Sequence, residues 1–297
     1  MSEVFDSAAQ IPADFAASCD PQPLPLTLLM CPPTYFDVVD VKNPHMAGHA
    51  GTVDFELAER QWHALREAFI ACGATVEAIE PLEDCEDMVF CANQTLAGLD
   101  AGGQRVCVAS QMRHASRRRE VPAFAAWFER RGYEVMHLPG EECFEGSGDA
   151  IWHPGRSLIW GGYGYRTDPE VYDAVSDMFG APVLRLALHS EHFYHLDTSF
   201  CAINEETALV YPGAFDEAGI DLIRAVFKDV IECNEAEALR GFACNATAIA
   251  GTHVVIQRGN PRTVEALRSR GLKVVEVDTS EFMKSGGSVF CMKMYVF

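Results

Sequence analysis

A repeated pattern of helix, glycine and apolar strand is the feature that most constrains what this sequence can fold into. In the first copy, apolar residues recur at helical spacing over residues 62–72, Gly73 ends the helix and a strand is predicted over 75–79. Three further copies keep this order: 121–128, Gly132 and 133–138; 171–179, Gly180 and 183–188; and 264–267, Gly271 and 272–277. A weaker fifth copy has a predicted helix over 220–231 and Cys233 in place of glycine.

Each copy also carries a second apolar strand, such as those predicted over residues 105–109, 157–161, 208–211 and 253–257. Five units of about 50 residues, each with strands and one helix, favour a closed radial array over a doubly wound open sheet. The sequence therefore predicts an α/β-propeller of five ββαβ-type blades. We expect one catalytic domain over 26–297, preceded by a flexible arm over 1–25 that contains four prolines.

The repeat also aligns polar residues that have no role in a core. Equivalent positions of a radial repeat lie near its axis, so residues at similar offsets from each unit's glycine should meet there. Asn93 lies 20 positions after Gly73, Glu145 lies 13 after Gly132, His195 lies 15 after Gly180, and Cys291 lies 20 after Gly271. A carboxylate, an imidazole and a thiol brought together in this way predict a nucleophilic site.

Composition limits the partners and the compartment. The formal net charge of −20 opposes binding to nucleic acid or to an anionic membrane; a solvated acidic surface explains it more simply than steering of small cations. The first apolar run, 24–29, is short and interrupted by Pro25, so it resembles neither a signal peptide nor a membrane span. Eleven cysteines without a CxxC pair favour free thiols in a cytoplasmic protein.

Three segments carry a resemblance to a known family. FEGSGD ending at Asp149, HLDTSF beginning at His195 and KSGGSVFC ending at Cys291 resemble the guanidine-modifying superfamily, whose members have the five-bladed pentein fold. Two more segments, 31–46 and 89–96, resemble the branch of dimethylarginine dimethylaminohydrolase-like proteins and arginine dihydrolases. The resemblance extends from about residue 26 to the C-terminus, and it implies a hydrolase that acts on a small guanidino amino acid.

The resemblance implies a role for each of four residues. Cys291 would attack the guanidinium carbon as a thiolate, and His195 would protonate the leaving amine and then deprotonate water. Glu145 would hydrogen-bond to His195 and hold its imidazolium. Asp197 would bind the guanidinium nitrogens.

Further residues match family positions that contact substrate. Arg166 and Arg113 would bind its carboxylate, since arginine forms bidentate contacts with carboxylates. Asn43, Asn93 and Asp149 complete the predicted substrate-binding set, although many members have EGGD where this chain has one residue more before Asp149.

The implied reaction passes through a covalent thiouronium on Cys291 and requires no metal or organic cofactor. Arginine dihydrolases carry asparagine where citrulline-forming relatives carry aspartate, so Asn93 favours ornithine, carbon dioxide and two ammonia molecules as products. Arginine deiminase, dimethylarginine dimethylaminohydrolase, amidinotransferase and a silent binding protein remain alternatives. A zinc enzyme using His189, His192 and His195 is disfavoured because the order matches none of the HExxH, HxxEH or HxE with PCxxC motifs. The oligomeric state is not predicted.

Overall fold

The computed structural model describes residues 3–297, in which the strands form five separate sheets. We call each sheet with its helix a blade. Blade one contains β16 (Met294–Val296), β2 (Thr27–Met30) and β3 (Thr75–Ala78); blade two β4 (Thr95–Leu99), β5 (Arg105–Ala109) and β6 (Glu134–His137); blade three β7 (Ala150–Trp152), β8 (Ile159–Tyr163) and β9 (Val183–Ala187); blade four β10 (Phe200–Ala202), β11 (Thr207–Val210) and β12 (Asp229–Glu232); blade five β13 (Thr247–Ile249), β14 (His253–Gln257) and β15 (Lys273–Val277).

Every blade has the same internal topology. Its first two strands pair antiparallel, and its second and third strands pair parallel. A parallel pair needs a crossover, and one helix supplies it in each blade. These helices are α2 (Phe55–Ala71), α4 (Val121–Glu129), α6 (Val171–Phe179), α7 (Glu217–Val226) and α9 (Pro261–Ser269). The predicted ββαβ-type repeat is therefore confirmed.

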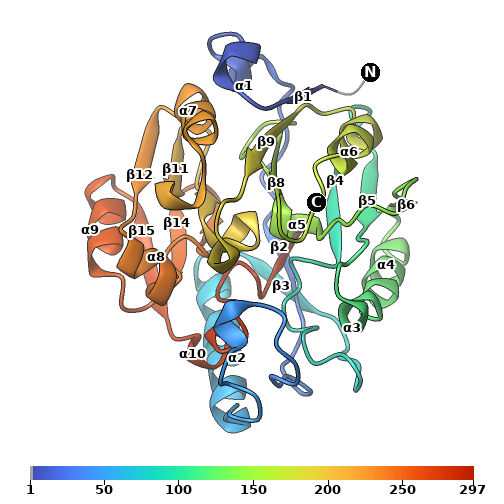
Figure 1. Cartoon of the computed structure of the whole chain (residues 1–297), viewed down its shortest axis with the longest axis vertical. Helices are drawn as coiled ribbons and strands as arrows, with labels where there is room; N and C mark the ends of the chain where they lie inside the picture. Colours follow the sequence, from blue (N-terminus) through green and yellow to red (C-terminus); the bar gives the residue numbers. More distant parts are fainter. Residues whose placement is uncertain (1–2) are drawn as a thin grey trace.

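The blades surround the middle of the molecule, with the crossover helices on the outside (Figure 1). Blade one joins distant parts of the chain, because the C-terminal strand β16 pairs antiparallel with β2. Neighbouring blades share cores, and one such core contains Trp160, Phe200 and Ile256 from blades three, four and five.

Several predicted boundaries need correction. Helix α2 begins at Phe55, seven residues before the predicted start at Trp62, because the Asp54 carboxylate caps it by accepting from the Leu57 backbone N–H. Helix α9 likewise begins early, at Pro261. Strand β8 begins at Ile159 rather than at the predicted residue 157.

The predicted C-terminal boundary of the fifth helix is wrong. Helix α7 stops at Val226, and Asp229–Glu232 forms strand β12 instead of continuing the helix to residue 231. Phe227 has extended backbone, and its buried ring stacks on Trp160 with centroids 5.3 Å apart. The apolar spacing that suggested one long helix thus combines a helix face with a strand in which Ile231 is buried.

The segment that precedes the first blade also differs from its prediction. Strand β1 (Val4–Phe5) pairs parallel with β9, and the side chain of Phe15 in helix α1 (Phe15–Ser18) is buried against the core. Residues 8–10 also contact helix α7 of blade four. The described part of residues 1–25 thus packs against blades three and four, which differs from the predicted loose arm. Residues 1–2 lie outside the described part of the chain.

The remaining described helices are short. They are η1 (Ala8–Gln10), η2 (Pro44–Met46), α3 (Ala115–Arg118), α5 (Gly146–Asp149), η3 (Glu191–Phe193), η4 (Leu196–Thr198), η5 (Pro212–Ala214), α8 (Glu235–Gly241) and α10 (Ser280–Met283). Among residues 3–297, no helix has both the length and the apolar character needed to span a bilayer.

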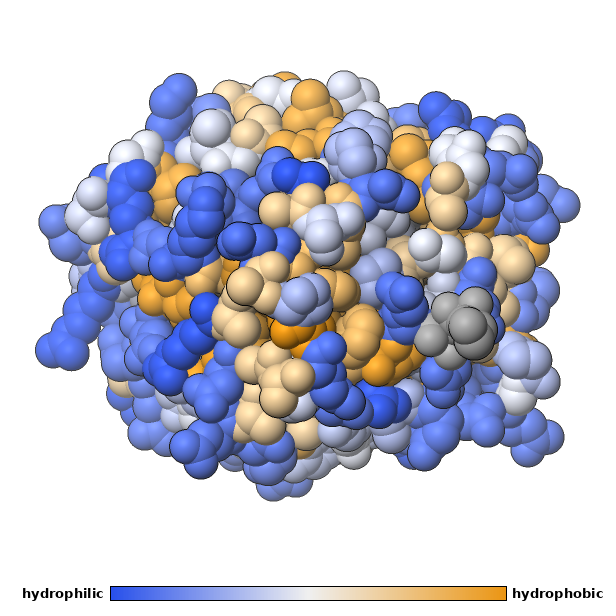
Figure 2. Space-filling view, turned by 90° about the horizontal axis from the view of Figure 1, so that it is seen from above, coloured by the Kyte–Doolittle hydropathy of each residue, from blue (hydrophilic) through white to orange (hydrophobic). Residues whose placement is uncertain are grey.

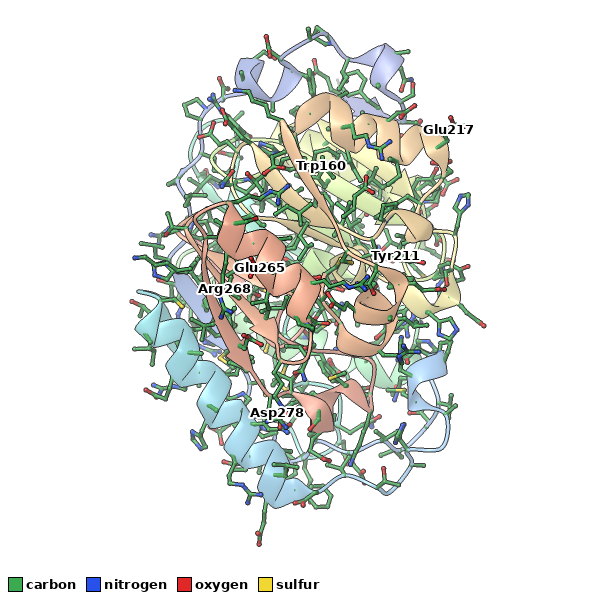
Figure 3. The ribbon with its side chains drawn as sticks, turned by 90° about the vertical axis from the view of Figure 1, so that its left-hand side faces the viewer. Trp160, Tyr211, Glu217, Glu265, Arg268 and Asp278 are labelled. Carbon is green, nitrogen blue, oxygen red and sulfur yellow. The ribbon has the colours of Figure 1, made fainter. Side chains whose placement is uncertain are left out.

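The surface is mainly hydrophilic on the face seen from the α1 end, in keeping with the many charged residues of the sequence (Figure 2). Apolar groups show between the hydrophilic side chains on this face (Figure 2). From the side, helix α9 with Glu265 and Arg268 lies on the outer surface of blade five (Figure 3). Apolar residues of α9, such as Val264 and Leu267, are buried beneath it.

Candidate active site

The predicted polar residues do converge. Asn93, Glu145, His195 and Cys291 each lie in the segment that leads into the first strand of a different blade. The carboxylate of Glu145 contacts the His195 ring, the Asn93 amide contacts the same ring, and Cys291 lines the same cavity as Asn93 and His195. The offsets from the glycines therefore predicted a real convergence.

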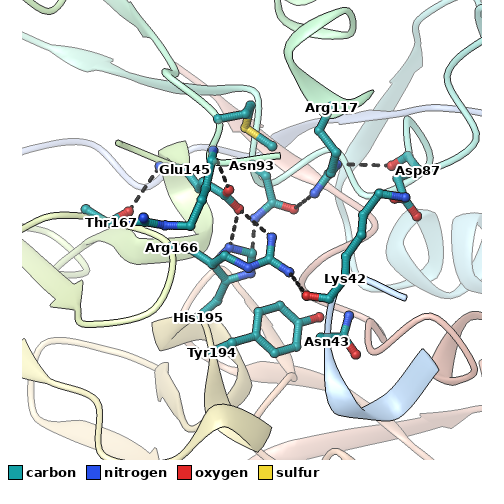
Figure 4. Close-up of polar contacts among 12 residues, drawn as sticks. Lys42, Asn43, Asp87, Asn93, Arg117, Glu145, Arg166, Thr167, Tyr194 and His195 are labelled. Carbon is teal, nitrogen blue, oxygen red and sulfur yellow. Dashed lines mark hydrogen bonds and ion pairs between the residues drawn. The ribbon is translucent and has the colours of Figure 1, made fainter. Parts of the chain in front are cut away.

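Glu145 and His195 form a buried pair at the centre of the site. Glu145 Oε2 lies 2.6 Å from His195 Nε2 and 3.2 Å from Arg166 Nη1 (Figure 4). Burial alone would raise the pKa of Glu145, but Arg166 and His195 offset this and hold the pKa well below its usual range. Burial lowers the pKa of His195 to about 4, even though Glu145 favours the charged ring. The resting pair is thus a carboxylate and a neutral imidazole.

A chain of hydrogen bonds fixes the tautomer of that imidazole. Arg117 can only donate, and its Nη1 lies 2.8 Å from Asn93 Oδ1, so the Asn93 amide nitrogen faces the other way. That nitrogen, Nδ2, lies 3.4 Å from His195 Nδ1, which must accept. The ring proton is therefore on Nε2, where it is donated to Glu145. Nδ1 keeps the lone pair that can take a proton.

Cys291 lies beside an acid and an amide. Its thiol donates to Asp197 Oδ2 at 3.1 Å, and Asn245 Nδ2 donates to its sulfur at 3.2 Å. Burial first, and then Asp197, raise the pKa of the Cys291 thiol well above its usual value. Asp197 Oδ1 is buried and has no hydrogen-bond partner among residues 3–297. A cation that bound this oxygen would offset the charge that keeps the thiol protonated.

The cavity in front of Cys291 has a volume of about 310 Å³. Three basic side chains line it, and each is paired to an acid: Lys42 with Asp87, Arg117 with Glu120 and Arg166 with Glu145. The other lining residues are Met46, Asp87, Phe90, Asn93, Tyr194, His195, Ser285, Gly287 and Cys291. Basic groups at the wall suit the carboxylate of an amino acid, while the acids behind them suit its cationic end.

Arg166 reaches this cavity, as the sequence predicted, whereas Arg113 does not. The Arg113 side chain is 39% exposed and donates to Asp168 at 2.6 Å, outside the residues that line the cavity. Arg117, four residues later in helix α3, is buried and lines the cavity instead. The sequence motif therefore pointed to the correct segment and to the wrong arginine.

Asp149 and Asn43 are buried near the site without lining the cavity. Asp149 accepts from the Leu196 backbone N–H at 3.0 Å and from the Thr167 hydroxyl at 2.7 Å, so it anchors the turn that follows His195. Asn43 Nδ2 donates to the Ser285 carbonyl at 3.0 Å, which ties the 42–46 segment to the loop that leads to Cys291. These contacts position the site. The extra residue before Asp149 is accommodated in the single turn of α5.

Sequence reasoning missed Lys42, Asp87, Arg117, Tyr194 and Asn245. The last had a signal: Asn245 lies two residues before β13, just as Asn93 lies two residues before β4. Its unit lacks the glycine from which the other offsets were counted, so the equivalence was hidden. The other four come from loops and from the short helix α3, whose positions the repeat does not fix. Across residues 3–297, no group of three or more His, Cys, Asp or Glu side chains is arranged to hold a metal ion.

Five ββαβ blades around a site with Cys291, His195 and Glu145 define the guanidine-modifying, or pentein, class of proteins. The sequence matches the family described as N,N dimethylarginine dimethylhydrolase, eukaryotic, over residues 43–297. It is 34% identical to the N(G),N(G)-dimethylarginine dimethylaminohydrolase of Mycobacterium tuberculosis, over 90% of this chain and 84% of that protein. The chain therefore belongs to the dimethylarginine dimethylaminohydrolase family.

A cyanobacterial protein is also similar. The bifunctional arginine dihydrolase/ornithine cyclodeaminase ArgZ of Synechocystis is 37% identical over 91% of this chain, which spans only 38% of the length of ArgZ. A cysteine-to-serine variant of the ArgZ N-terminal domain, solved with bound substrate, superposes with a TM-score of 0.86 at 34% identity. That match covers 91% of this chain and 97% of the solved domain.

Proposed function

We propose that this protein is an arginine dihydrolase that converts L-arginine and two waters to ornithine, carbon dioxide and two ammonia molecules. The orientation of the Asn93 amide carries the proposal. Because Arg117 occupies Oδ1, the amide presents N–H groups towards His195 and the cavity. A fixed donor beside the nucleophile can hold the oxygen of a neutral ureido group, which an ionised aspartate cannot do.

The first round forms citrulline. The guanidinium binds with its N–H groups towards the free oxygen of Asp197, and the thiol proton of Cys291 passes to His195 Nδ1. The thiolate attacks the guanidinium carbon, His195 returns the proton to the departing ammonia, and a covalent thiouronium remains. Water, deprotonated by His195, then breaks the carbon–sulfur bond. Glu145 stabilises the charged ring in both steps.

The second round starts from citrulline that stays bound. Asn93 donates to the ureido oxygen, and Cys291 attacks the ureido carbon and expels a second ammonia. Water then hydrolyses the thiocarbamate, and the resulting carbamate decomposes to ornithine and carbon dioxide. Both rounds use the same groups, so what distinguishes a dihydrolase from a citrulline-forming enzyme is how long citrulline is held.

A dimethylarginine dimethylaminohydrolase is the second candidate, because the family match and the M. tuberculosis relative favour it. In that case the same attack releases dimethylamine and leaves citrulline as the final product. An amidinotransferase would pass the amidino group to an amine instead of water, and adding glycine would then yield guanidinoacetate.

Product analysis separates these candidates. The purified protein is incubated with arginine, dimethylarginine or agmatine, and ornithine, citrulline and ammonia are quantified. We expect two ammonia and one ornithine per arginine, with little turnover of agmatine, which lacks the carboxylate. Asn93→Asp should shift the product towards citrulline, since the donor is lost. Stoichiometric citrulline from the wild-type protein would rule out the dihydrolase.

A further inference from the structure

Asn245 is a fully buried amide at the site that the reaction outlined above does not use. It lies in blade five, directly before β13, at the position that Asn93 occupies in blade two. Four hydrogen bonds use its side chain, and two of them involve Cys291.

The orientation of this amide follows from its partners. Oδ1 faces the backbone N–H groups of Ser288 at 3.0 Å and Cys291 at 3.3 Å, and these groups can only donate. Nδ2 must therefore point the opposite way, where it donates to the Asp197 carbonyl at 2.9 Å and to the Cys291 sulfur at 3.2 Å. A flipped amide would place two donors against two backbone donors.

This geometry makes the sulfur the acceptor of a fixed N–H. A hydrogen bond to the charged form of a group favours that form, and a bond to an ion is stronger than a bond to a neutral atom. The N–H of Asn245 thus opposes the effects of burial and of Asp197 on the thiol. It acts before substrate binds and needs no movement of the chain.

We propose that Asn245 is a catalytic residue that stabilises the Cys291 thiolate through its side-chain N–H, in addition to holding the loop that carries Cys291. The inference rests on the proposed function only in taking Cys291 as the nucleophile. A purely structural role for Asn245 would hold the loop through Oδ1 without affecting ionisation of the sulfur.

Asn245→Asp separates the two roles. The substitution keeps an oxygen for the Ser288 and Cys291 N–H groups and replaces the donor that faces the sulfur. Asn260→Asp is the matched control: Asn260 is buried in the same blade, and its Nδ2 donates to the Gly241 and Gln257 carbonyls, each at 2.8 Å. Asn245→Ala removes both the donor and the acceptor.

The readout is the rate at which iodoacetamide alkylates Cys291 at different pH values without substrate, followed by mass spectrometry of the Cys291 peptide. Loss of a charge-assisted hydrogen bond should raise the pH of half-maximal alkylation by about one unit or more in both Asn245 variants. With arginine, kcat should fall at least about tenfold while KM changes little. Asn260→Asp should leave the alkylation midpoint unchanged.

An unchanged midpoint in a folded Asn245 variant overturns the proposal. If neither variant folds, the NMR resonance of the Asn245 side-chain amide in the wild-type protein is the test. Its chemical shift should change with pH at the same midpoint as alkylation, and this change should be absent in Cys291→Ser. A constant resonance likewise overturns it. Alkylation needs no turnover, so a shifted midpoint in a protein inactive on arginine would support the role of Asn245 and contradict the proposed function.

Discussion

Two cavities adjoin the first strands of the blades, and they differ in size and in chemistry. The candidate site, of about 310 Å³, lies where these strands begin. A second cavity, of about 730 Å³, lies further along the same strands. Asn93 and Cys291 line the candidate site, whereas Ala97 and Tyr295, four residues later in each segment, line the second cavity. Trp152, Phe290, Tyr295 and Phe297 are among the apolar residues that line the larger cavity.

The comparison shows that convergence of loops marks the site better than volume does. The smaller cavity is lined by four charged side chains, Lys42, Asp87, Arg117 and Arg166, all supplied by segments outside the strands. The larger one is lined mainly by small and aromatic side chains from the strands and the turns near them. Loops can differ in every blade while the strands must still pack, so chemistry gathers at the loop end.

The largest expected effect comes from exchanging a thiol at each cavity. Cys291→Ser should abolish turnover of arginine while the fold is kept, because an alcohol lacks the nucleophilicity of a thiolate at neutral pH. Cys201→Ser, at a buried thiol of the larger cavity, should leave kcat within about twofold, since sulfur there takes no part in the reaction. If Cys291→Ser kept more than a few per cent of the wild-type rate, covalent catalysis by this residue would be excluded.

Replacing one arginine near each cavity should give the next largest difference in kinetics between the two cavities. In the proposed reaction Arg166 binds the substrate carboxylate. Losing such a charge-assisted contact in Arg166→Ala typically costs about 1.5–3 kcal/mol and should raise KM roughly ten- to a hundredfold. The kcat should also fall, because Arg166 holds Glu145 ionised. Arg156→Ala, next to the larger cavity, breaks the ion pair with Glu205 and hydrogen bonds to the Ala17 and Cys19 carbonyls. It should leave both constants unchanged. Unchanged kinetics in Arg166→Ala would remove this residue from the site.

The sequence predicted the blades and the convergence of polar residues more reliably than it predicted which side chains line the cavity. Glycine-terminated helices and apolar strands are local signals, so four of the five units, and Glu145 beside His195, could be placed from spacing and motifs. Local sequence signals could not show which of Arg113 and Arg117 reaches the cavity. Both lie in one short segment, and only the course of that segment decides which side chain turns inward. Asn245 was missed because Cys233 replaces the glycine used for counting.

The pH dependence of kcat/KM should reflect ionisable groups at the charged cavity. Burial is the main cause that raises the pKa of Asp197 to about 7 from its ordinary value of 3.8, against the Cys291 hydrogen bond, which lowers it. In the proposed reaction an ionised Asp197 binds the guanidinium, so kcat/KM for arginine should fall about tenfold per pH unit below 7. A profile that stays flat from pH 8 to 5 would contradict this role.

The same titration has a consequence for stability. Because the pKa of Asp197 is higher in the folded than in the unfolded protein, its favourable contribution is complete below about pH 3.8 and is lost as the pH rises through about 7. Asp197→Asn cannot ionise and should therefore raise Tm at pH 8 relative to the wild-type protein, while it abolishes turnover. The difference in Tm should shrink at pH 5, and calorimetry at the two pH values tests this.

The smallest expected effect is that of filling the larger cavity. Ala202 lies in β10 and lines this cavity, and valine is favoured in strands, so Ala202→Val adds two methyl groups where space exists. We expect a Tm within a few degrees of wild type and kcat and KM within about twofold. Strand β10 follows His195 after the single turn of η4, so a shift of the strand would be transmitted to the imidazole. A kcat reduced tenfold at unchanged Tm would show that the two cavities are coupled, and the separation between an apolar packing end and a reactive loop end would then fail.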